Sequence, residues 1–195
     1  MERRALRIVS GDFRGKALIA PKGEATRPTS DRARQAIFNI LEHAPWSPGV
    51  RERRVIDLFA GSGALGFEAL SRGASFCLFV ETDEAARGAI RDNVEALGGL
   101  FGKTRVHRRS ATDLGVKPGA DGPAFDLAFL DPPYARGLGE QALERLVAGG
   151  WLAPGAIVVF ERGVGEPPFE VSGFEPLDAR DYGAARVYFL RYTQT

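Results

Sequence analysis

The chain has 195 residues, which is enough for one full domain with a small appendage. Its composition, 44% hydrophobic and 26% charged, is that of a globular protein, and no apolar run approaches the ~20 residues of a membrane helix. One cysteine excludes an internal disulfide framework, and two histidines with one cysteine make a poor metal set. With no apolar signal core at the N-terminus, these features predict a cytoplasmic protein that binds neither a metal nor a membrane.

The net charge of +1 is unevenly distributed along the chain. Residues 1–54 carry 12 Lys and Arg against 6 Asp and Glu, whereas residues 55–195 carry 14 against 19. A basic arm on a mildly acidic body suits a polyanionic partner, although chance segregation of solvated charge would give the same counts.

Residues 1–53 are predicted to form a small β/α extension. The segments LRIV and KALIA have the composition of short β-strands, and the glycine-flanked GDFRG between them is typical of a turn. After a loop over residues 21–29, the sequence predicts a helix with Ser30 as its N-cap. Its apolar face comprises Ala33, Ile37, Phe38, Ile40 and Leu41.

From residue 54 onward, apolar runs of strand length alternate with helical stretches. Helices are expected at 64–71, 83–97 and 138–148, and strands at 54–59, 76–81, 104–108, 126–131 and 156–161. Such alternation favours a mostly parallel sheet covered on both faces, which is a doubly wound, Rossmann-like α/β domain over 54–195. Two further strand-like segments, within 169–180 and 184–193, have no helix between them and predict a terminal antiparallel hairpin.

A glycine-rich loop follows the first expected strand. Gly61, Gly63 and Gly66 match G-x-G-x-x-G between a strand and a helix, and the acid Glu81 ends the second strand. This combination is typical of a site for an adenosine-containing cofactor, whose ribose hydroxyls such an acid can bind. The structural alternative for Glu81 is an acid flanking the N-terminus of the next helix.

Two cofactor classes compete for this loop. NAD would place its pyrophosphate at the helix N-terminus, whereas S-adenosylmethionine carries a sulfonium and an amino group. Asp57, in the last turn of the first strand, suits the cationic amino acid portion of S-adenosylmethionine and would repel a pyrophosphate. Asp57 could instead be an acid that caps the loop.

The fourth strand ends abruptly at Asp131-Pro132-Pro133-Tyr134. Proline fixes φ, lacks an N–H and forces the preceding residue to be extended, so the tetrapeptide is a stiff row of acceptors. The carboxylate of Asp131 and the carbonyl of Pro132 could hold both hydrogens of an exocyclic base amine, and Tyr134 could stack on the base. The structural alternative is a proline turn with an incidental tyrosine.

At these residues the chain resembles a known family. The stretches LRIVSGDFRGKALIAPKGEATRPTSDRARQAIFNIL, VIDLFAGSGALGFEALSRGA, FVE and FLDPPY resemble, in order, the bacterial 16S rRNA (guanine-N2)-methyltransferases, the RsmD-like proteins. The resemblance spans essentially the whole chain. It implies methyl transfer from S-adenosylmethionine to one guanine of 16S rRNA in an assembling 30S particle. We further expect a monomer that needs no metal.

The resemblance also implies roles for individual residues. Asp131 to Tyr134 correspond to the catalytic tetrapeptide, and the cofactor site corresponds to Asp57, Gly61, Ser62, Gly63 and Glu81. After the third strand, many relatives have Asp or Asn where this chain has Arg109 or Ser110. Ser110, a backbone group or Asp113 is therefore expected to contact the adenine.

RNA contacts are expected from the basic arm, whose charges can bind phosphates. The candidates are Arg7, Arg14, Arg27, Arg32 and Arg34. Arg14 and Arg27 are favoured because they fall in loops, whereas Arg32 and Arg34 on the helix could instead pair with acids of the body.

Three other functions compete with this reading. The first is an amino-methyltransferase acting on DNA or another RNA, although no long insertion for target recognition is visible. The second is an NAD-dependent dehydrogenase, for which neither His43 nor His107 is well placed. The third is a non-catalytic RNA-binding module, which would not need Asp131.

Overall fold

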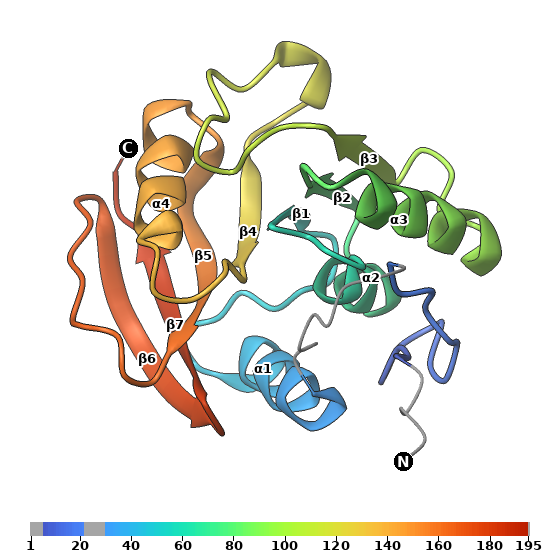
Figure 1. The fold of residues 1–195 in the computed structure, drawn as a ribbon, viewed down its shortest axis with the longest axis horizontal. Helices are drawn as coiled ribbons and strands as arrows, with labels where there is room; N and C mark the ends of the chain where they lie inside the picture. The colour runs from blue at the N-terminus through green and yellow to red at the C-terminus, as the bar shows by residue number, and fades with distance from the viewer. Residues whose placement is uncertain (1–5, 22–29, 195) are drawn as a thin grey trace.

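A seven-stranded sheet forms the centre of the molecule in the computed structural model, which describes residues 6–21 and 30–194 (Figure 1). Its strand order is β3-β2-β1-β4-β5-β7-β6. The strands are β1 (Arg54–Leu58), β2 (Phe76–Val80), β3 (Thr104–His107), β4 (Phe125–Leu130), β5 (Leu152–Gly163), β6 (Phe174–Tyr182) and β7 (Ala185–Tyr192). Strands β1 to β5 pair in parallel, while β7 runs antiparallel to both β5 and β6. The predicted α/β class is therefore confirmed.

The helices also match the sequence pattern closely. They are α1 (Asp31–His43), α2 (Ala64–Ser71), α3 (Glu84–Leu97) and α4 (Leu138–Ala148), with a short 3-10 turn, η1, at Gly119–Asp121. Side chains fix two of the starts: Ser30 Oγ accepts from the Ala33 N–H, and Asp83 Oδ1 accepts from the Ala86 N–H. The predicted cap at Ser30 is thus confirmed.

Helices lie on both faces of the sheet (Figure 1). Alternate strand residues point to opposite faces, so Phe79 and Phe129 join the cluster that α1, α2 and α3 cover. Leu78 and Leu130 join the cluster under α4, which contributes Leu143. The sheet is consequently buried on both sides, which explains why its strands are almost continuously apolar.

The chain reverses its direction of winding between β1 and β4. Helices α2 and α3 carry the chain from β1 to β2 and on to β3, and it then returns to place β4 on the other side of β1. A crevice is expected outside the carboxyl ends of strands at such a switch point. The glycine loop after β1 and the tetrapeptide after β4 therefore lie at the edge of the sheet where ligands of this fold class bind.

The two predicted N-terminal β segments pair with each other through backbone hydrogen bonds, but neither is a regular strand in the described residues. Between residues 6 and 21 the structure has one isolated antiparallel bridge, Arg7 with Ala17. Neighbouring backbone groups bind the body instead of a second strand: Val9 and Ser10 donate to the Glu68 carboxylate. The Ile19 N–H likewise donates to Asn93 Oδ1 at 2.7 Å. These side-chain acceptors end the ladder after one bridge.

The N-terminal extension shares its core with the sheet. Ile8 and Leu18 are buried in the same cluster as Phe38 of α1 and Phe129 of β4, and the Phe38 and Phe129 ring centroids lie 5.5 Å apart. The two parts of the chain are therefore not separate in their packing. The division at residue 53 stays a proposal, in which the first part binds RNA and the second transfers the methyl group.

The terminal hairpin is confirmed, with one shift. The segment predicted as its first strand becomes β6 only from Phe174. Before that point Phe169 packs edge-on against Phe160 and Tyr188, at centroid distances of 5.2 and 5.0 Å. The Phe169 ring is thus part of the α4-side core instead of a strand.

We predict that Gly66→Ala destabilises the protein by about 1–3 kcal/mol, because overpacking a filled core forces its neighbours to move. A Cβ at Gly66 would lie 2.3 Å from the Phe79 ring and 2.7 Å from Cys77 Sγ, both of which are buried. Chemical denaturation measures the change. Gly88→Ala in α3 is the matched control, since nothing lies within 4 Å of its added Cβ; it should stabilise the helix slightly. Equal effects of the two variants would contradict the packing argument.

Candidate active site

Three chain segments meet at the carboxyl edge of the sheet. They are the loop that follows β1, Glu81 directly after β2, and Asp131 to Tyr134 after β4. The register pairs Leu58 with both Val80 and Leu130, so these segments leave the sheet at one level. Parallel pairing thus brings together residues that are up to 75 positions apart in the sequence.

Asp57 is the buried acid of this edge, with 2% of its surface exposed. Its Oδ2 accepts the Gly66 N–H at 3.0 Å, as expected for an acid that caps the loop. Burial raises the pKa of Asp57 well above its usual range, the Gly66 hydrogen bond opposes that rise, and the charges of Asp131 and Glu81 add to it. The three carboxylates therefore form one electrostatically coupled, acidic cluster.

The glycine loop leaves room for a ligand. Gly61 has φ +52°, and among the described residues only the Phe59 carbonyl oxygen comes as close as 4.0 Å to a Cβ added there. Gly63, at φ +77°, begins α2, and a Cβ there would lie 2.7 Å from the Phe67 ring. Phe59 itself has φ +58°, a region that non-glycine residues rarely adopt. Such backbone strain is found preferentially at functional sites.

Glu81 bridges the glycine loop and the start of α3. Its Oε2 accepts the Gly61 N–H at 2.8 Å, and its Oε1 accepts the Asp83 N–H at 2.9 Å. The second bond is the helix-flanking role that the sequence left open as an alternative. The first places the carboxylate directly against the loop.

Ser110 follows β3 at the same edge, where it builds a turn. Its Oγ lies 2.8 Å from Thr112 Oγ1 and accepts the Thr112 N–H at 3.2 Å. The Ser110 carbonyl accepts the Asp113 N–H, and the Asp113 side chain is exposed. Ser110 as the adenine contact stays a prediction.

The tetrapeptide is more buried in its first half than in its second. Asp131 is half-buried, Pro132 is buried, and Pro133 and Tyr134 are exposed. Pro132 packs closely against α4, since a Cβ added at Gly139 would lie 3.1 Å from its Cγ. Tyr134 retains 39% exposure, so its ring is accessible for stacking.

Sequence reasoning missed Glu161, which holds the tetrapeptide from β5. The Tyr134 hydroxyl donates to Glu161 Oε1 at 2.5 Å, and Glu161 is only 9% exposed. The available signal was positional: like Glu81 and Asp131, Glu161 comes at the carboxyl end of an apolar strand run. Its link to Tyr134, 27 residues earlier, is not visible in the sequence.

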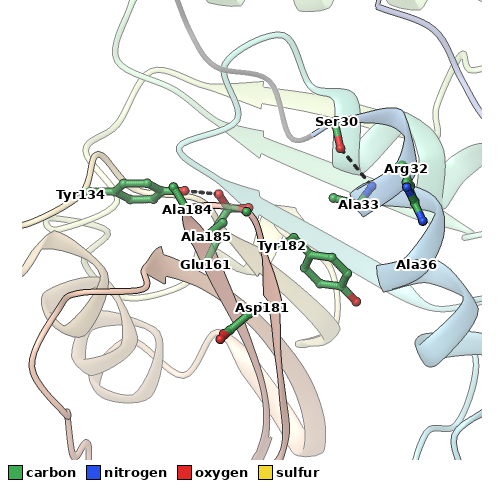
Figure 2. Close-up of a pocket in the computed structure, with 11 residues that line it drawn as sticks. Ser30, Arg32, Ala33, Ala36, Tyr134, Glu161, Asp181, Tyr182, Ala184 and Ala185 are labelled. Carbon is green, nitrogen blue, oxygen red and sulfur yellow. Dashed lines mark hydrogen bonds between the residues drawn. The ribbon is translucent and has the colours of Figure 1, made fainter.

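A cavity of about 680 Å³ opens beside Tyr134 and Glu161. Figure 2 shows both residues on one wall, Tyr182 and the β6–β7 turn on another, and the first turns of α1 opposite. Ser30 and Arg32 line the α1 side. Tyr182 was also missed, because nothing in the sequence places the hairpin turn near the tetrapeptide.

The expected RNA-binding arginines have different surroundings. Arg7 is exposed and pairs with Asp31 at 3.1 Å. Arg14 is exposed in the turn after Gly11, and Arg32 is exposed on α1. Arg27 lies outside the described residues.

Arg34 does not belong to this surface. Its side chain is fully buried and donates to Asp31 Oδ1 at 2.8 Å and to the Arg7 carbonyl. Its Nε also lies 3.7 Å from the carboxylate of the equally buried Glu68. The expectation that Arg34 contacts RNA phosphate is therefore corrected to the alternative, an ion pair with acids of the body.

Over residues 6–21 and 30–194, no group of three or more His, Cys, Asp or Glu side chains could hold a metal ion. No helix of that part of the chain is both long and apolar enough to cross a membrane.

Comparison with known proteins connects this geometry to a family. The family model described as Conserved hypothetical protein 95 matches residues 6–191. The ribosomal RNA small subunit methyltransferase D of Haemophilus influenzae is 37% identical over 156 residues, which cover 80% of this chain and 78% of that protein. The chain belongs to the RsmD-like family of ribosomal RNA methyltransferases. The resemblance inferred from the sequence motifs is confirmed.

Solved structures agree with membership of the RsmD-like family. The Escherichia coli protein yhhF superposes with a TM-score of 0.83 at 31% identity, covering 97% of this chain and 98% of that one. An RNA methyltransferase from Salinibacter ruber, solved with S-adenosyl-L-homocysteine, has a TM-score of 0.61 at 16% identity and covers 86% of this chain and 95% of its own. The latter likeness shows the shared fold.

Proposed function

We propose that this protein transfers a methyl group from S-adenosylmethionine to the exocyclic N2 amine of a guanine in 16S rRNA. The observation that carries the proposal is the rigid tetrapeptide Asp131–Tyr134, held at the switch-point edge beside the acidic cluster of Asp57 and Glu81. Membership of the RsmD-like family supports rRNA as the substrate.

The residues of the edge fit S-adenosylmethionine better than a dinucleotide. A cluster of three carboxylates attracts the sulfonium and ammonium groups of S-adenosylmethionine, and it would repel the pyrophosphate of NAD. The space at Gly61 admits a ligand against the loop backbone. Proposed cofactor contacts are Asp57, Gly61, Ser62, Gly63 and Glu81, with Ser110 near the adenine. When bound, S-adenosylmethionine supplies an electrophilic methyl group.

The protein's part in the reaction is to prepare the amine. The N2 amine is a weak nucleophile because its lone pair is delocalised into the purine ring. In our proposal the Asp131 carboxylate and the Pro132 carbonyl accept its two hydrogens, Tyr134 stacks on the base, and the nitrogen lone pair is aimed at the methyl group. The acceptors stabilise positive charge that develops on nitrogen, and the proton leaves afterwards, so no strong base is needed beforehand.

The target guanine must leave any duplex to reach this edge. Exposed Arg7, Arg14 and Arg32, with Arg27, are proposed to hold the surrounding phosphates. We further propose that the protein acts as a monomer in the cytoplasm on a partly assembled 30S particle.

Cofactor affinity should rise with pH through the raised pKa of Asp57. A cationic ligand favours the ionised carboxylate, so below that pKa binding must release a proton, and above it binding releases none. Titration calorimetry in buffers of different ionisation enthalpy counts this proton. Asp57→Asn should weaken binding and remove the pH dependence. An unchanged pH profile in that variant would show that another group titrates.

Arg14→Ala should weaken RNA binding and reduce the slope of log K against log salt by about 1, because one phosphate contact is lost. Filter binding of 16S rRNA at several salt concentrations measures the slope. Arg180→Ala on β6 is the matched control, since Arg180 is exposed but pairs with Asp178 at 2.9 Å. Equal slopes for both variants and the wild type would show that Arg14 does not contact an RNA phosphate.

The proposed function is tested with S-adenosylmethionine labelled in its methyl group. The acceptors are 30S particles lacking the modification, naked 16S rRNA and duplex DNA. We expect label in the RNA or the particle and none in the DNA. Label in the DNA alone would favour the alternative, a DNA amino-methyltransferase, and no label would contradict both. Nuclease mapping of the labelled RNA then locates the modified nucleotide.

A further inference from the structure

The cavity beside the tetrapeptide has the size of a nucleobase site. Its volume of about 680 Å³ falls within the roughly 300–1,000 Å³ typical of small-molecule pockets. Tyr134, the ring proposed to stack on the base, forms part of its wall together with Glu161 and Tyr182 (Figure 2). A base stacked on Tyr134 would therefore present its edge to the groups lining this cavity.

Glu161 is the cavity carboxylate whose position is fixed relative to that ring. It is 9% exposed, and the Tyr134 hydroxyl donates to its Oε1 at 2.5 Å. A hydrogen bond from the phenol to this carboxylate fixes the ring relative to Glu161.

Strand register sets Glu161 beside Asp131. The pairing of β4 with β5 ends at Leu130 and Phe160, and both of these side chains belong to the cluster under α4. The next residues, Asp131 and Glu161, follow at the same level and on the opposite face, with neighbouring strands about 4.8 Å apart. Strand pairing therefore sets Asp131 next to Glu161, which lines the cavity.

Two neighbouring acceptors match only one of the three amino-bearing bases. In guanine, the ring atom N1 next to the N2 amine carries a hydrogen, so the edge presents adjacent donors. In adenine and cytosine, the ring nitrogen next to the amine on the Watson–Crick edge is an acceptor. An ionised carboxylate only accepts, so it binds guanine N1–H and repels the lone pair of the other two bases.

We propose that Glu161 is the residue that determines guanine specificity: its carboxylate accepts the N1–H while Asp131 and the Pro132 carbonyl hold the N2 amine. The inference rests on the proposed function and adds the group that reads the base. Sites built to bind a substrate N–H reject analogues that lack it by large factors, since a buried acceptor is then left unpaired.

The test replaces the mapped target guanosine of 16S rRNA with 2-aminopurine by splinted ligation. 2-Aminopurine keeps the N2 amine but has an acceptor at N1. For the wild type we expect kcat/KM to favour guanine by at least about 100-fold. Glu161→Gln should narrow that ratio strongly, because its amide can donate to the N1 of 2-aminopurine. A rise in kcat/KM on the 2-aminopurine RNA would not follow if Glu161 had a merely structural role.

Two further variants keep the test decisive. Glu161→Asp retains the carboxylate, so it should lose rate yet keep its preference for guanine, even if Glu161→Gln fails to fold by thermal melting. Glu175→Gln on β6, outside the cavity, should leave the ratio unchanged. A wild type that accepts both bases equally, or a loss of preference in Glu161→Asp, would overturn the inference; so would a folded Glu161→Gln with an unchanged ratio. A wild type inactive on guanosine would instead overturn the proposed function.

Discussion

Asp131→Ala should lower kcat for methyl transfer by about 10²- to 10³-fold or more, the usual loss when one preorganised partner of the developing charge is removed. In our account Asp131 accepts a hydrogen of the target amine and stabilises the charge that appears on its nitrogen. The Pro132 carbonyl remains in the variant but lacks a full negative charge. Single-turnover transfer of labelled methyl to 16S rRNA measures the chemical step.

Cofactor affinity separates this role from a structural one. Asp131 raises the pKa of Asp57 through its charge but is not among the proposed cofactor contacts, so the dissociation constant for S-adenosylmethionine should change only a few-fold in Asp131→Ala. Asp131→Asn, which keeps a neutral acceptor, should fall between the alanine variant and the wild type. Loss of cofactor binding in parallel with activity would mean that the chemistry lies elsewhere.

Glu68→Ala should destabilise the protein by about 3–5 kcal/mol, because it removes the buried carboxylate that two buried arginines share. Glu68 on α2 is fully buried; its carboxylate lies 2.8 Å from Arg72 Nε and 3.7 Å from Arg34 Nε. It also accepts the backbone N–H groups of Val9 and Ser10, at 2.8 and 3.0 Å. One side chain thus joins α1, α2 and the N-terminal segment.

For a chain of this length, that loss corresponds to a fall in Tm of roughly 6–20 °C, which calorimetry measures readily. Glu144→Ala is the matched control, since Glu144 is exposed on α4, and it should change stability by less than about 0.5 kcal/mol. A loss in Glu68→Ala as small as in the control would show that Asp31 and Glu42, which also pair with the two arginines, are sufficient, and that the N-terminal segment does not depend on Glu68.

The sheet and its edge could be predicted because their signals are local. Strands β1 and β2 match the apolar runs within one residue at their ends, because a fully buried parallel strand must be apolar throughout. Because the carboxyl ends of parallel strands share one edge of the sheet, the sequence pattern is enough to place Asp57, Glu81 and Asp131 at that edge. Any chain with this alternation and these strand-end acids would place them together.

Contacts made by side chains across long sequence separations were not predictable. The sequence predicts Arg34 as an exposed helix residue. Its charge can be buried because the equally buried Glu68, 34 positions later, lies beside it. The LRIV and KALIA segments pair as predicted, but only over one bridge, because the N–H groups of Val9 and Ile19 are bound by side chains of the body. The bond between Tyr134 and Glu161 likewise depends on how β5 aligns with β4.

Nucleoside mass spectrometry tests most directly whether the protein methylates guanine N2 and whether Asp131 is required for it. 30S particles lacking the modification are incubated with S-adenosylmethionine and either the wild type or Asp131→Ala, and the rRNA is digested to nucleosides. We expect one N2-methylguanosine per particle with the wild type and essentially none with the variant. Methylation of an adenine or cytosine amine, or equal N2-methylguanosine with both proteins, would contradict this expectation.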